Sequence, residues 1–428
     1  MNIYAVHEEK PAIRFPVQEG QDSNRLTSTI VKVVGTGGGG SNAVNRMIDF
    51  GLSGVQFVAV NTDEKDLCKS KAKIKLQIGS KLTGGRGAGG KPEVGEEAAN
   101  EDEDLISETL RGAHMVFIAA GMGGGTGTGS APVIAKIARE QGALTVGVIT
   151  KPFDFEGRYK MKLAEEGIRK MREAVDTLII VPNQNLFKIV ERSTPLKQAY
   201  LLADDILRQG VQGISDLITK TGVVSLDFAD VESIMKNQGD ALMGIGLAEG
   251  ENRAKDAATS AIDNPLLEDT TIDGATRILV NIAGEEKTMS LVEIDEIMNI
   301  IKAKADPDAN IIHGVIFEPE LGSSLRVTVI ATGFQNGIFK EAGGSAGEDP
   351  RVKDIGDFIN YADFEGLREG TGRQGFLGRR SYQDDLDIPT VIRDRGYSAQ
   401  KAEQAAKGFS DRSPEYPGEK NAADGRDA

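Results

Sequence analysis

From Ile30 onward, short apolar runs alternate with glycine-rich turns and with stretches of helical periodicity. Short apolar runs bounded by turn residues are typical of strands that are buried on both faces. In the first half of the chain such strands are predicted at 30–34, 55–60, 115–120, 144–149 and 178–181, with helices at 43–50 and 132–140. This alternation predicts an α/β fold whose parallel sheet is covered by helices on both faces.

A long amphipathic helix comes after the predicted sheet. Apolar residues recur at helical spacing from Leu196 to Ile218. Ser193 or Thr194 is expected to be the N-cap, with Pro195 as the first helical residue. Gly222 is the expected stop. The pattern therefore predicts a central helix that connects the parallel-sheet domain to the C-terminal half of the chain.

A second, smaller α/β domain is predicted after this helix, with strands at 277–283, 314–317 and 325–331. Beyond it the chain is rich in Gly, Ser, Asp, Arg and Gln, which is typical of disorder. The expected divisions are a flexible leader (1–27), a nucleotide-binding domain (28–193), the central helix (194–222), a smaller C-terminal domain (223–335), a disordered linker (336–381), a partner-binding peptide (382–396) and a disordered extension (397–428).

Composition excludes several classes of protein. The net charge is -15, without the basic patch that marks nucleic-acid binders. The one cysteine, Cys68, excludes a disulfide framework, and the isolated His7, His114 and His313 offer little scope for a protein-held metal. We expect a cytoplasmic protein without direct membrane insertion, because no signal peptide and no apolar run of membrane-spanning length is present.

The first glycine-rich segment, Gly35 to Asn42, lies between a predicted strand and a predicted helix. It contains the G-x-G-x-x-G spacing of a dinucleotide-binding turn in Gly35, Gly37 and Gly40. Glycines let the backbone approach a phosphate, and a helix N-terminus favours an anion. This motif alone leaves nicotinamide or flavin binding open.

A second glycine-rich segment, Gly121 to Ser130, again joins a strand to a helix and adds the hydroxyls of Thr126 and Thr128. Two such turns at one edge of a parallel sheet can converge on a single polyphosphate. The chain has no G-x-x-x-x-G-K-[ST] sequence, which excludes a P-loop NTPase.

With these two segments the chain resembles the FtsZ family of tubulin-like GTPases of bacterial cell division, from about Ile30 to Gly333. The run Gly-Gly-Gly-Thr-Gly-Thr-Gly at 123–129 matches the signature of the tubulin superfamily. The resemblance implies binding of GTP or GDP, with Mg²⁺ held by the phosphates. The residues that it implies for nucleotide contact are Gly38, Gly39, Gly40, Ser41, Asn42, Arg46, Ala88, Gly89, Gly90, Gly124, Gly125, Thr126, Gly127, Glu156, Lys160, Asn183, Tyr200 and Asp204.

Two of these residues fit recognition of guanine. Tyr200 and Asp204 are four residues apart and share one face of the central helix. An aromatic ring can stack on a purine, and a carboxylate can accept from both N1–H and the 2-amino group of guanine. Adenine offers neither donor there, so guanine is expected to bind more strongly. The alternative is a half-buried tyrosine and a solvated aspartate on an amphipathic helix.

Asp227 and Asp230 come soon after the central helix. By themselves they fit an N-cap with an acidic residue at N3. The family resemblance implies, in addition, that they are the catalytic carboxylates of a synergy loop that enters the nucleotide site of the next subunit. Such contacts join a top face to a bottom face, so copies of the chain are expected to form head-to-tail filaments.

The chain departs from the family pattern at three of these segments and at its end. Ser225 replaces the usual Asn of the synergy loop, Lys160 the usual Arg, and Lys91 the usual Asn before Pro92. The chain also continues beyond the usual terminal peptide. That peptide, Asp384–Arg393, resembles the family's docking segment for membrane-tethering division proteins, which implies a place in the mid-cell ring beneath the inner membrane.

Two other functions stay open from the sequence. One is a tubulin-like filament GTPase with a task other than division. The other is an NAD(P)-dependent oxidoreductase, in which Asp63 would bind the ribose, although this leaves the second glycine-rich segment and Asp204 without a role.

Overall fold

The structure is a computed structural model that describes residues 29–334 except 192, 221 and 265–271. Its strands are β1 (Val31–Thr36), β2 (Val55–Asn61), β3 (Ile74–Gln77), β4 (Met115–Gly121), β5 (Leu144–Lys151), β6 (Thr177–Pro182), β7 (Gly239–Ala248), β8 (Arg277–Gly284), β9 (Asn310–Phe317) and β10 (Leu325–Thr332). Its α-helices are α1 (Gly37–Asp49), α2 (Glu64–Lys69), α3 (Ser80–Thr83), α4 (Pro92–Glu101), α5 (Glu103–Leu110), α6 (Thr126–Glu140), α7 (Arg158–Ala174), α8 (Leu196–Thr219), α9 (Phe228–Met235), α10 (Arg253–Ile262) and α11 (Leu291–Lys304). Three short 3₁₀ helices are η1 (Asp154–Glu156), η2 (Asn183–Lys188) and η3 (Pro319–Leu321).

The strands lie in the order β3-β2-β1-β4-β5-β6-β7-β10-β8-β9. All neighbours from β3 to β7 are parallel, whereas β10 is antiparallel to both β7 and β8. β1 and β4 are adjacent and in register, from Val31 opposite Met115 to Thr36 opposite Ala120. The two glycine-rich segments therefore leave the same edge of the sheet side by side.

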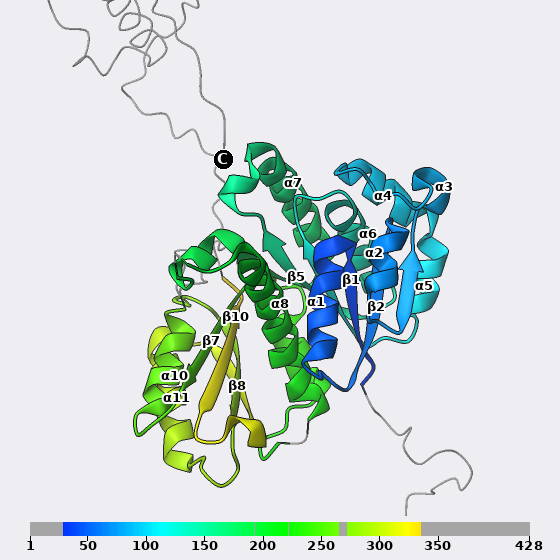
Figure 1. Cartoon of the computed structure of the whole chain (residues 1–428). Coiled ribbons are helices and arrows are strands. Elements are labelled where there is room, and N and C mark those ends of the chain that lie inside the picture. The colour runs from blue at the N-terminus through cyan, green and yellow to red at the C-terminus, as the bar shows by residue number, and fades with distance from the viewer. Residues whose placement is uncertain (1–28, 192, 221, 265–271, 335–428) are drawn as a thin grey trace, which may run out of the picture. The chain divides into compact units, whose positions relative to one another are not determined.

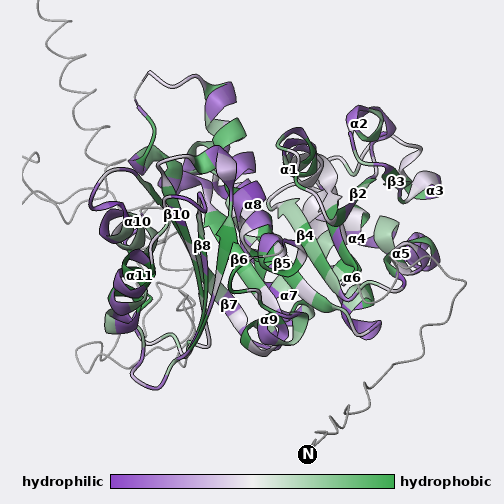
Figure 2. Cartoon of the chain, turned by 90° about the horizontal axis from the view of Figure 1, so that it is seen from below, coloured by the Kyte–Doolittle hydropathy of each residue, from purple (hydrophilic) through white to green (hydrophobic). Residues whose placement is uncertain are grey.

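Apolar side chains cover both faces of the parallel part of the sheet. Met47 of α1 and Ile214 of α8 belong to one buried cluster, and Ala98 of α4 and Ile134 of α6 belong to another on the opposite face. Figure 2 shows hydrophobic strands inside and hydrophilic helix surfaces outside. This arrangement is the one expected for strands without polar positions.

The central helix α8 passes between the two halves of the described fold (Figure 1). Its buried face carries Ile206, Val211 and Ile214, in line with the helical spacing seen in the sequence. At 24 residues it is about 36 Å long, taking roughly 1.5 Å per residue. It is therefore long enough to run from the edge of the sheet where the parallel strands end to the edge where they begin.

The mixed α/β architecture with a mostly parallel sheet is confirmed, but several predicted boundaries were wrong. α1 begins at Gly37 and α6 at Thr126, because the glycines are themselves part of the first helical turns. The N-cap of α8 is Pro195 rather than Ser193 or Thr194, and the helix ends at Thr219, before Gly222. The edge strand β3 and the strand β7 were not predicted.

In the described ranges of the chain, no helix has both the length and the apolar character needed to span a membrane. The predicted leader, the linker, the partner-binding peptide and the extension lie outside the described residues.

Candidate functional site

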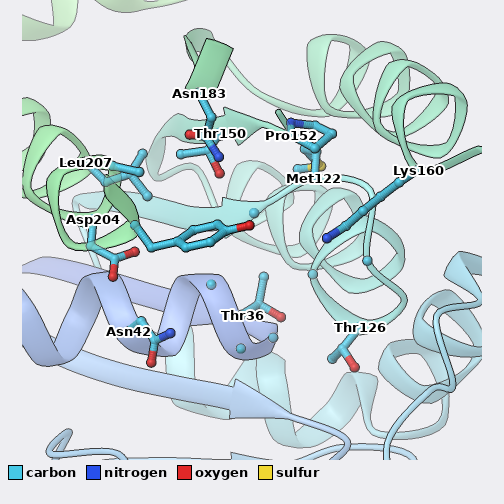
Figure 3. Close-up of a pocket in the computed structure, with 18 of the residues that line it drawn as sticks. Thr36, Asn42, Met122, Thr126, Thr150, Pro152, Lys160, Asn183, Asp204 and Leu207 are labelled. Carbon is cyan, nitrogen blue, oxygen red and sulfur yellow. The ribbon is translucent and has the colours of Figure 1, made fainter. Parts of the chain in front are cut away.

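A cavity of about 370 Å³ opens at the edge of the sheet where β1 and β4 end. Its lining is formed by the two glycine-rich segments, the residues after β5 and β6, and the first half of α8. In Figure 3, Asp204 and Asn42 lie at one end of this cavity, and Thr126 and Lys160 at the other. The cavity thus extends from the Asp204 carboxylate to the first turns of α1 and α6.

The amino ends of α1 and α6 meet in this cavity. A Cβ added to Gly37 would lie 2.7 Å from the nitrogen of Gly127, and one added to Gly39 would lie 3.2 Å from Gly121. Both helices begin without a side-chain cap and without an acidic residue in the first turn. Their first N–H groups and their dipoles therefore point into one small space, which favours an anion with several oxygens.

A hydrogen-bond chain fixes the hydroxyls at this end. Ser130 Oγ donates to the carbonyl of Thr126 at 2.7 Å, so Thr36 Oγ1 must be the donor in its 2.5 Å bond to Ser130. Thr126 Oγ1 bonds to Thr62 Oγ1 at 2.6 Å, and either can donate. When Thr62 donates, the hydrogen of Thr126 is free to bond to a ligand oxygen.

The segment Gly87–Lys91 packs against the start of α6. A Cβ on Gly125 would lie 2.9 Å from both the Ala88 Cβ and the Lys91 nitrogen. Gly89 and Gly90 are exposed, with φ of +60° and +73°. The segment borders the end of the cavity where α1 and α6 begin, but it does not line the cavity. The exposed Lys91 is the N-cap of α4.

Tyr200 and Asp204 both line the cavity, on the face of α8 that their spacing predicts. The ring of Tyr200 is held edge-on by Phe153, with centroids 5.5 Å apart. Burial raises the pKa of Asp204 to about 6, although Arg46 lowers it and Asp205 raises it further. Burial, and then the charge of Glu156, raise the pKa of Tyr200. A carboxylate with this pKa is mostly ionised at neutral pH and is short of hydrogen-bond donors.

Arg46 lies behind this carboxylate and not on the cavity wall. Its Nε is 3.6 Å from Asp205, and its guanidinium lies 4.4 Å from the ring centre of Phe50. Arg208 lies 4.5 Å from the same ring centre and bonds to Asp205 at 2.8 Å. Within this cluster, Arg46 stabilises the ionised form of Asp204 from outside the cavity, whereas the charge of Asp205 opposes it.

Three further predicted residues line the cavity. Glu156 accepts from the Phe153 nitrogen at 2.9 Å and pairs with Lys160, so Lys160 keeps a cation where an arginine was expected. The Oδ1 atom of Asn183 is buried and has no hydrogen-bond partner among the described residues. An amide oxygen so placed can accept from a hydroxyl or amino group of a ligand.

Twelve of the sequence-predicted contact residues line the cavity: Gly38, Gly39, Asn42, Gly124, Gly125, Thr126, Gly127, Glu156, Lys160, Asn183, Tyr200 and Asp204. The six that do not are Gly40, Ser41, Arg46, Ala88, Gly89 and Gly90. Gly40 serves packing, since a Cβ there would lie 2.2 Å from the Ala119 oxygen. Ser41 is buried on the same helix, and its Oγ has no partner within the described part of the chain.

Sequence reasoning did not select eight lining residues: Thr36, Gly37, Gly121, Met122, Thr150, Pro152, Ala203 and Leu207. Most adjoin a glycine-rich segment or end a predicted strand, which is the signal that could have identified them. Asp63, the ribose-binding residue of the oxidoreductase hypothesis, caps α2 by accepting from the nitrogens of Lys65 and Asp66. Asp63 also does not line the cavity, which counts against that hypothesis.

Asp227 and Asp230 lie at the opposite end of the sheet from the cavity. Asp227 Oδ1 accepts from the Asp230 nitrogen at 2.9 Å, and Asp230 Oδ2 accepts from the Asp227 nitrogen at 3.2 Å, so they form a capping box. Phe228, which follows Asp227, contacts His114, and the two ring centres are 6.3 Å apart. His114 immediately precedes β4. The cavity adjoins Gly121 at the other end of β4, about 20 Å away at roughly 3.3 Å per residue.

Comparison with known proteins agrees with this architecture. The family model "Tubulin/FtsZ family, GTPase domain" matches residues 30–191, and "FtsZ family, C-terminal domain" matches 239–335. A solved FtsZ dimer from M. jannaschii is 43% identical, with a TM-score of 0.70, over 76% of this chain and 96% of that chain. A solved point mutant of FtsZ from M. jannaschii is 45% identical, with a TM-score of 0.69, over 72% of this chain and 92% of that chain.

A more distant structure, CetZ2 from Haloferax volcanii in a GTPγS-bound protofilament, shares the fold. It is 22% identical, with a TM-score of 0.59, over 71% of this chain and 92% of that chain. The two family matches and the identity to FtsZ, together with the paired glycine-rich helix starts, show that the chain belongs to the FtsZ family of tubulin-like GTPases.

Proposed function

We propose that the chain is a filament-forming GTPase of cell division in which GTP bound by one subunit is hydrolysed with the help of Asp227 and Asp230 of the next. The observation that carries this proposal is the separation of these carboxylates from the cavity by the length of β4. In a single subunit they cannot reach a nucleotide held at Gly121. A neighbour stacked end to end would bring them there.

In this proposal the phosphates lie where α1 and α6 begin, between Gly38 and Gly127, and Thr126 donates its hydroxyl hydrogen to a phosphate oxygen. The guanine lies at the other end, where the Asp204 carboxylate accepts from N1–H and the 2-amino group while Tyr200 stacks on the ring. Asn183 and Glu156 lie between the two ends and bond to the ribose. The partly buried Asp204 carboxylate gives a reason for selecting guanine, because a base without donors would leave this acceptor unpaired.

Mg²⁺ would be held mainly by the phosphates. The described residues contain no group of three or more His, Cys, Asp or Glu close enough to hold a metal ion, and Glu156 is already paired with Lys160. A cation coordinated by phosphate oxygens and water fits this donor set, with the Thr126 hydroxyl nearby. When bound, such an ion neutralises phosphate charge, which is why two added carboxylates can approach.

Asp227 and Asp230 would orient and polarise the attacking water at the terminal phosphate. Phosphoryl transfer depends on positioning and charge stabilisation more than on covalent chemistry, so two carboxylates on a fixed helix start are sufficient for that role. Their capping box holds both side chains in place at the amino end of α9. Capping and catalysis are therefore compatible uses of one pair.

Head-to-tail contacts of this kind do not close, and they build filaments. The M. jannaschii relative was solved as a dimer, which supports self-association. The division role rests on family membership and on the predicted peptide Asp384–Arg393, which lies outside the described residues. Recruitment by membrane-tethering division proteins and a place in the mid-cell ring stay predictions.

A mixing experiment tests the composite site. Asp230→Ala should bind GTP normally and hydrolyse little, whereas Thr126→Val should bind little GTP and keep its own carboxylates. Neither variant should turn over alone, and their mixture should recover part of the activity, since one supplies GTP and the other carboxylates. Asp256→Ala, which removes an acidic residue from the first turn of α10, is the matched control and should retain turnover.

One outcome would contradict the composite site. If Asp230→Ala loses only about 1 kcal/mol of stability, as the loss of a helix cap predicts, and hydrolyses GTP at the normal rate, these carboxylates do not act on the GTP of the neighbouring subunit. A nucleotide-exchange measurement that compares binding of GTP with binding of NAD tests the oxidoreductase alternative separately.

A further inference from the structure

The helix that carries the proposed catalytic carboxylates is held at its carboxyl end by side chains of three strands. α9 has Asp227 as its N-cap and ends at Met235. The last carbonyl groups of a helix have no partner within the helix. In α9, the carbonyls of residues 233, 234 and 235 each accept a hydrogen bond from a different strand. The three donors are Thr177, Arg277 and Thr332, and we call them the carbonyl clamp.

The two threonines of the clamp are buried. Thr332 Oγ1, at the end of β10, donates to the Ile234 carbonyl at 2.9 Å. Thr177 Oγ1, at the start of β6, donates to the Met235 carbonyl. Both threonines and both residues that accept these bonds have no exposed surface. Because the groups are shielded from solvent, loss of a hydroxyl would leave a buried carbonyl without this donor.

Arg277 binds the same turn of α9. Its Nη1 donates to the Ser233 carbonyl at 2.6 Å. Arg277 begins β8 and lies opposite Thr332 in the ladder between β8 and β10. Its cation also lies at the carboxyl end of α9, where the helix dipole favours positive charge. Three consecutive carbonyls are thus fixed from two sides.

The clamp connects α9 to both halves of the fold. β6 is one of the parallel strands that carry the nucleotide cavity, whereas β8 and β10 lie beyond β7, where β10 is antiparallel to both of its neighbours. In Figure 2, which views the molecule from below, α9 lies next to β7, the strand that joins the two groups. A helix bonded to both halves takes its position from both.

The clamp is close enough to the carboxylates for small movements to matter. From Met235 the helix rises about 7.5 Å to Asp230 and about 12 Å to Asp227, at roughly 1.5 Å per residue. A tilt of about 10° at the clamp would therefore displace Asp227 by about 2 Å. A misplacement of about 1 Å can cost roughly a hundredfold in rate. The clamp can therefore control hydrolysis without contacting the nucleotide.

We infer that Thr177, Arg277 and Thr332 are positioning residues for hydrolysis, which hold α9 so that its carboxylates meet the GTP of the next subunit. None of the three lines the cavity, so their effect on GTP must pass through α9. The inference rests on the proposed action of Asp227 and Asp230 on a neighbour's GTP. It adds that the rate depends on both halves of the subunit that supplies the carboxylates.

Valine substitutions test the clamp in the full-length chain. Thr332→Val and Thr177→Val each remove one donor and keep the branched shape of the side chain. Each variant should bind GTP like wild type, because the cavity is unchanged. Its kcat per assembled subunit, from phosphate release and sedimentation, should fall about tenfold or more with KM nearly unchanged. Thr332→Ser and Thr177→Ser keep the hydroxyl and should restore most of the turnover.

Thr145→Val is the matched control. Thr145 is also fully buried, near the start of β5, and its Oγ1 donates at 3.0 Å to the carbonyl of Ala143, which is not part of α9. The substitution therefore removes a comparable buried hydrogen bond and leaves the clamp intact. Its turnover should stay near wild type.

Mixing variants identifies the subunit that carries the fault. Thr332→Val holds GTP normally and presents displaced carboxylates, so adding Thr126→Val, whose carboxylates are intact, should recover part of the turnover. Adding Asp230→Ala should not, because every GTP then faces displaced or missing carboxylates. A fault in GTP binding would give the reverse pattern.

Three results would overturn the inference. They are wild-type turnover in either valine variant, recovery with Asp230→Ala in place of Thr126→Val, and an equal loss of turnover in Thr145→Val, which would assign the effect to general destabilisation. The mixture of Asp230→Ala with Thr126→Val tests the proposed function separately. If that pair recovers turnover while Thr332→Val behaves like wild type, the composite site stands and only the clamp is wrong. If that pair fails, both are wrong.

Discussion

The ionisation of Asp204 should set the pH dependence of nucleotide binding. Burial raises the pKa of this carboxyl to about 6, with Arg46 acting in the opposite direction. Only the ionised form can accept both guanine donors, so affinity should follow the ionised fraction. That fraction falls roughly tenfold between pH 7 and pH 5 for a pKa near 6. GTP binding should therefore weaken about tenfold over this interval, and the loss should occur as pH falls.

Removing Arg46 sharpens this prediction. Arg46→Gln takes away the cation that lowers the pKa of Asp204, so the binding curve should move to higher pH. Arg46→Lys keeps the charge and should stay near wild type. Because Arg46 does not line the cavity, a shift in the pH profile reports its electrostatic effect and not a lost contact.

Calorimetric titration with GTP between pH 5 and pH 8 measures this effect. The phosphates also titrate in the range, so Asp204→Asn serves as the reference that cannot ionise at this position. The difference between the wild-type and Asp204→Asn profiles isolates the carboxylate. Parallel profiles for the two proteins would refute the assignment of Asp204 to the base, and an unchanged Arg46→Gln profile would refute the role of Arg46.

Further predictions concern packing, phosphate contact and the tail. Gly40→Ala should destabilise the fold by about 1–3 kcal/mol in thermal unfolding, because its Cβ would lie 2.2 Å from the Ala119 oxygen. Gly38→Ala should unfold like wild type, because its Cβ would lie 3.6 Å from the Asp66 side-chain oxygen. Gly125→Ser should abolish GTP binding in a filter assay, since its added atoms meet Ala88 and Lys91; normal affinity would place the phosphates elsewhere. Deleting Asp384–Arg393 should leave GTP turnover intact and stop membrane recruitment in cells, and a purified truncation without turnover would contradict this.

Local patterns in the sequence specify the type of fold and much of the cavity. Uninterrupted apolar strands such as β4 have no polar side to expose, so they require helices on both faces. Two glycine-rich segments that each follow such a strand must leave the sheet at its carboxyl edge, and β1 and β4 are indeed neighbours. The four-residue spacing of Tyr200 and Asp204 likewise placed both on the cavity side of α8, because helical geometry is local.

Features that depend on contacts between distant segments follow only from the three-dimensional packing. Gly38 and Gly40 belong to the same glycine-rich segment, yet of these two only Gly40 lies against β4, because strand order determines which side of α1 is covered. Arg46 acts from behind Asp204 because α8 packs beside α1. Local periodicity fixes which face of an element is apolar, whereas long-range packing fixes which residues of other elements that face meets.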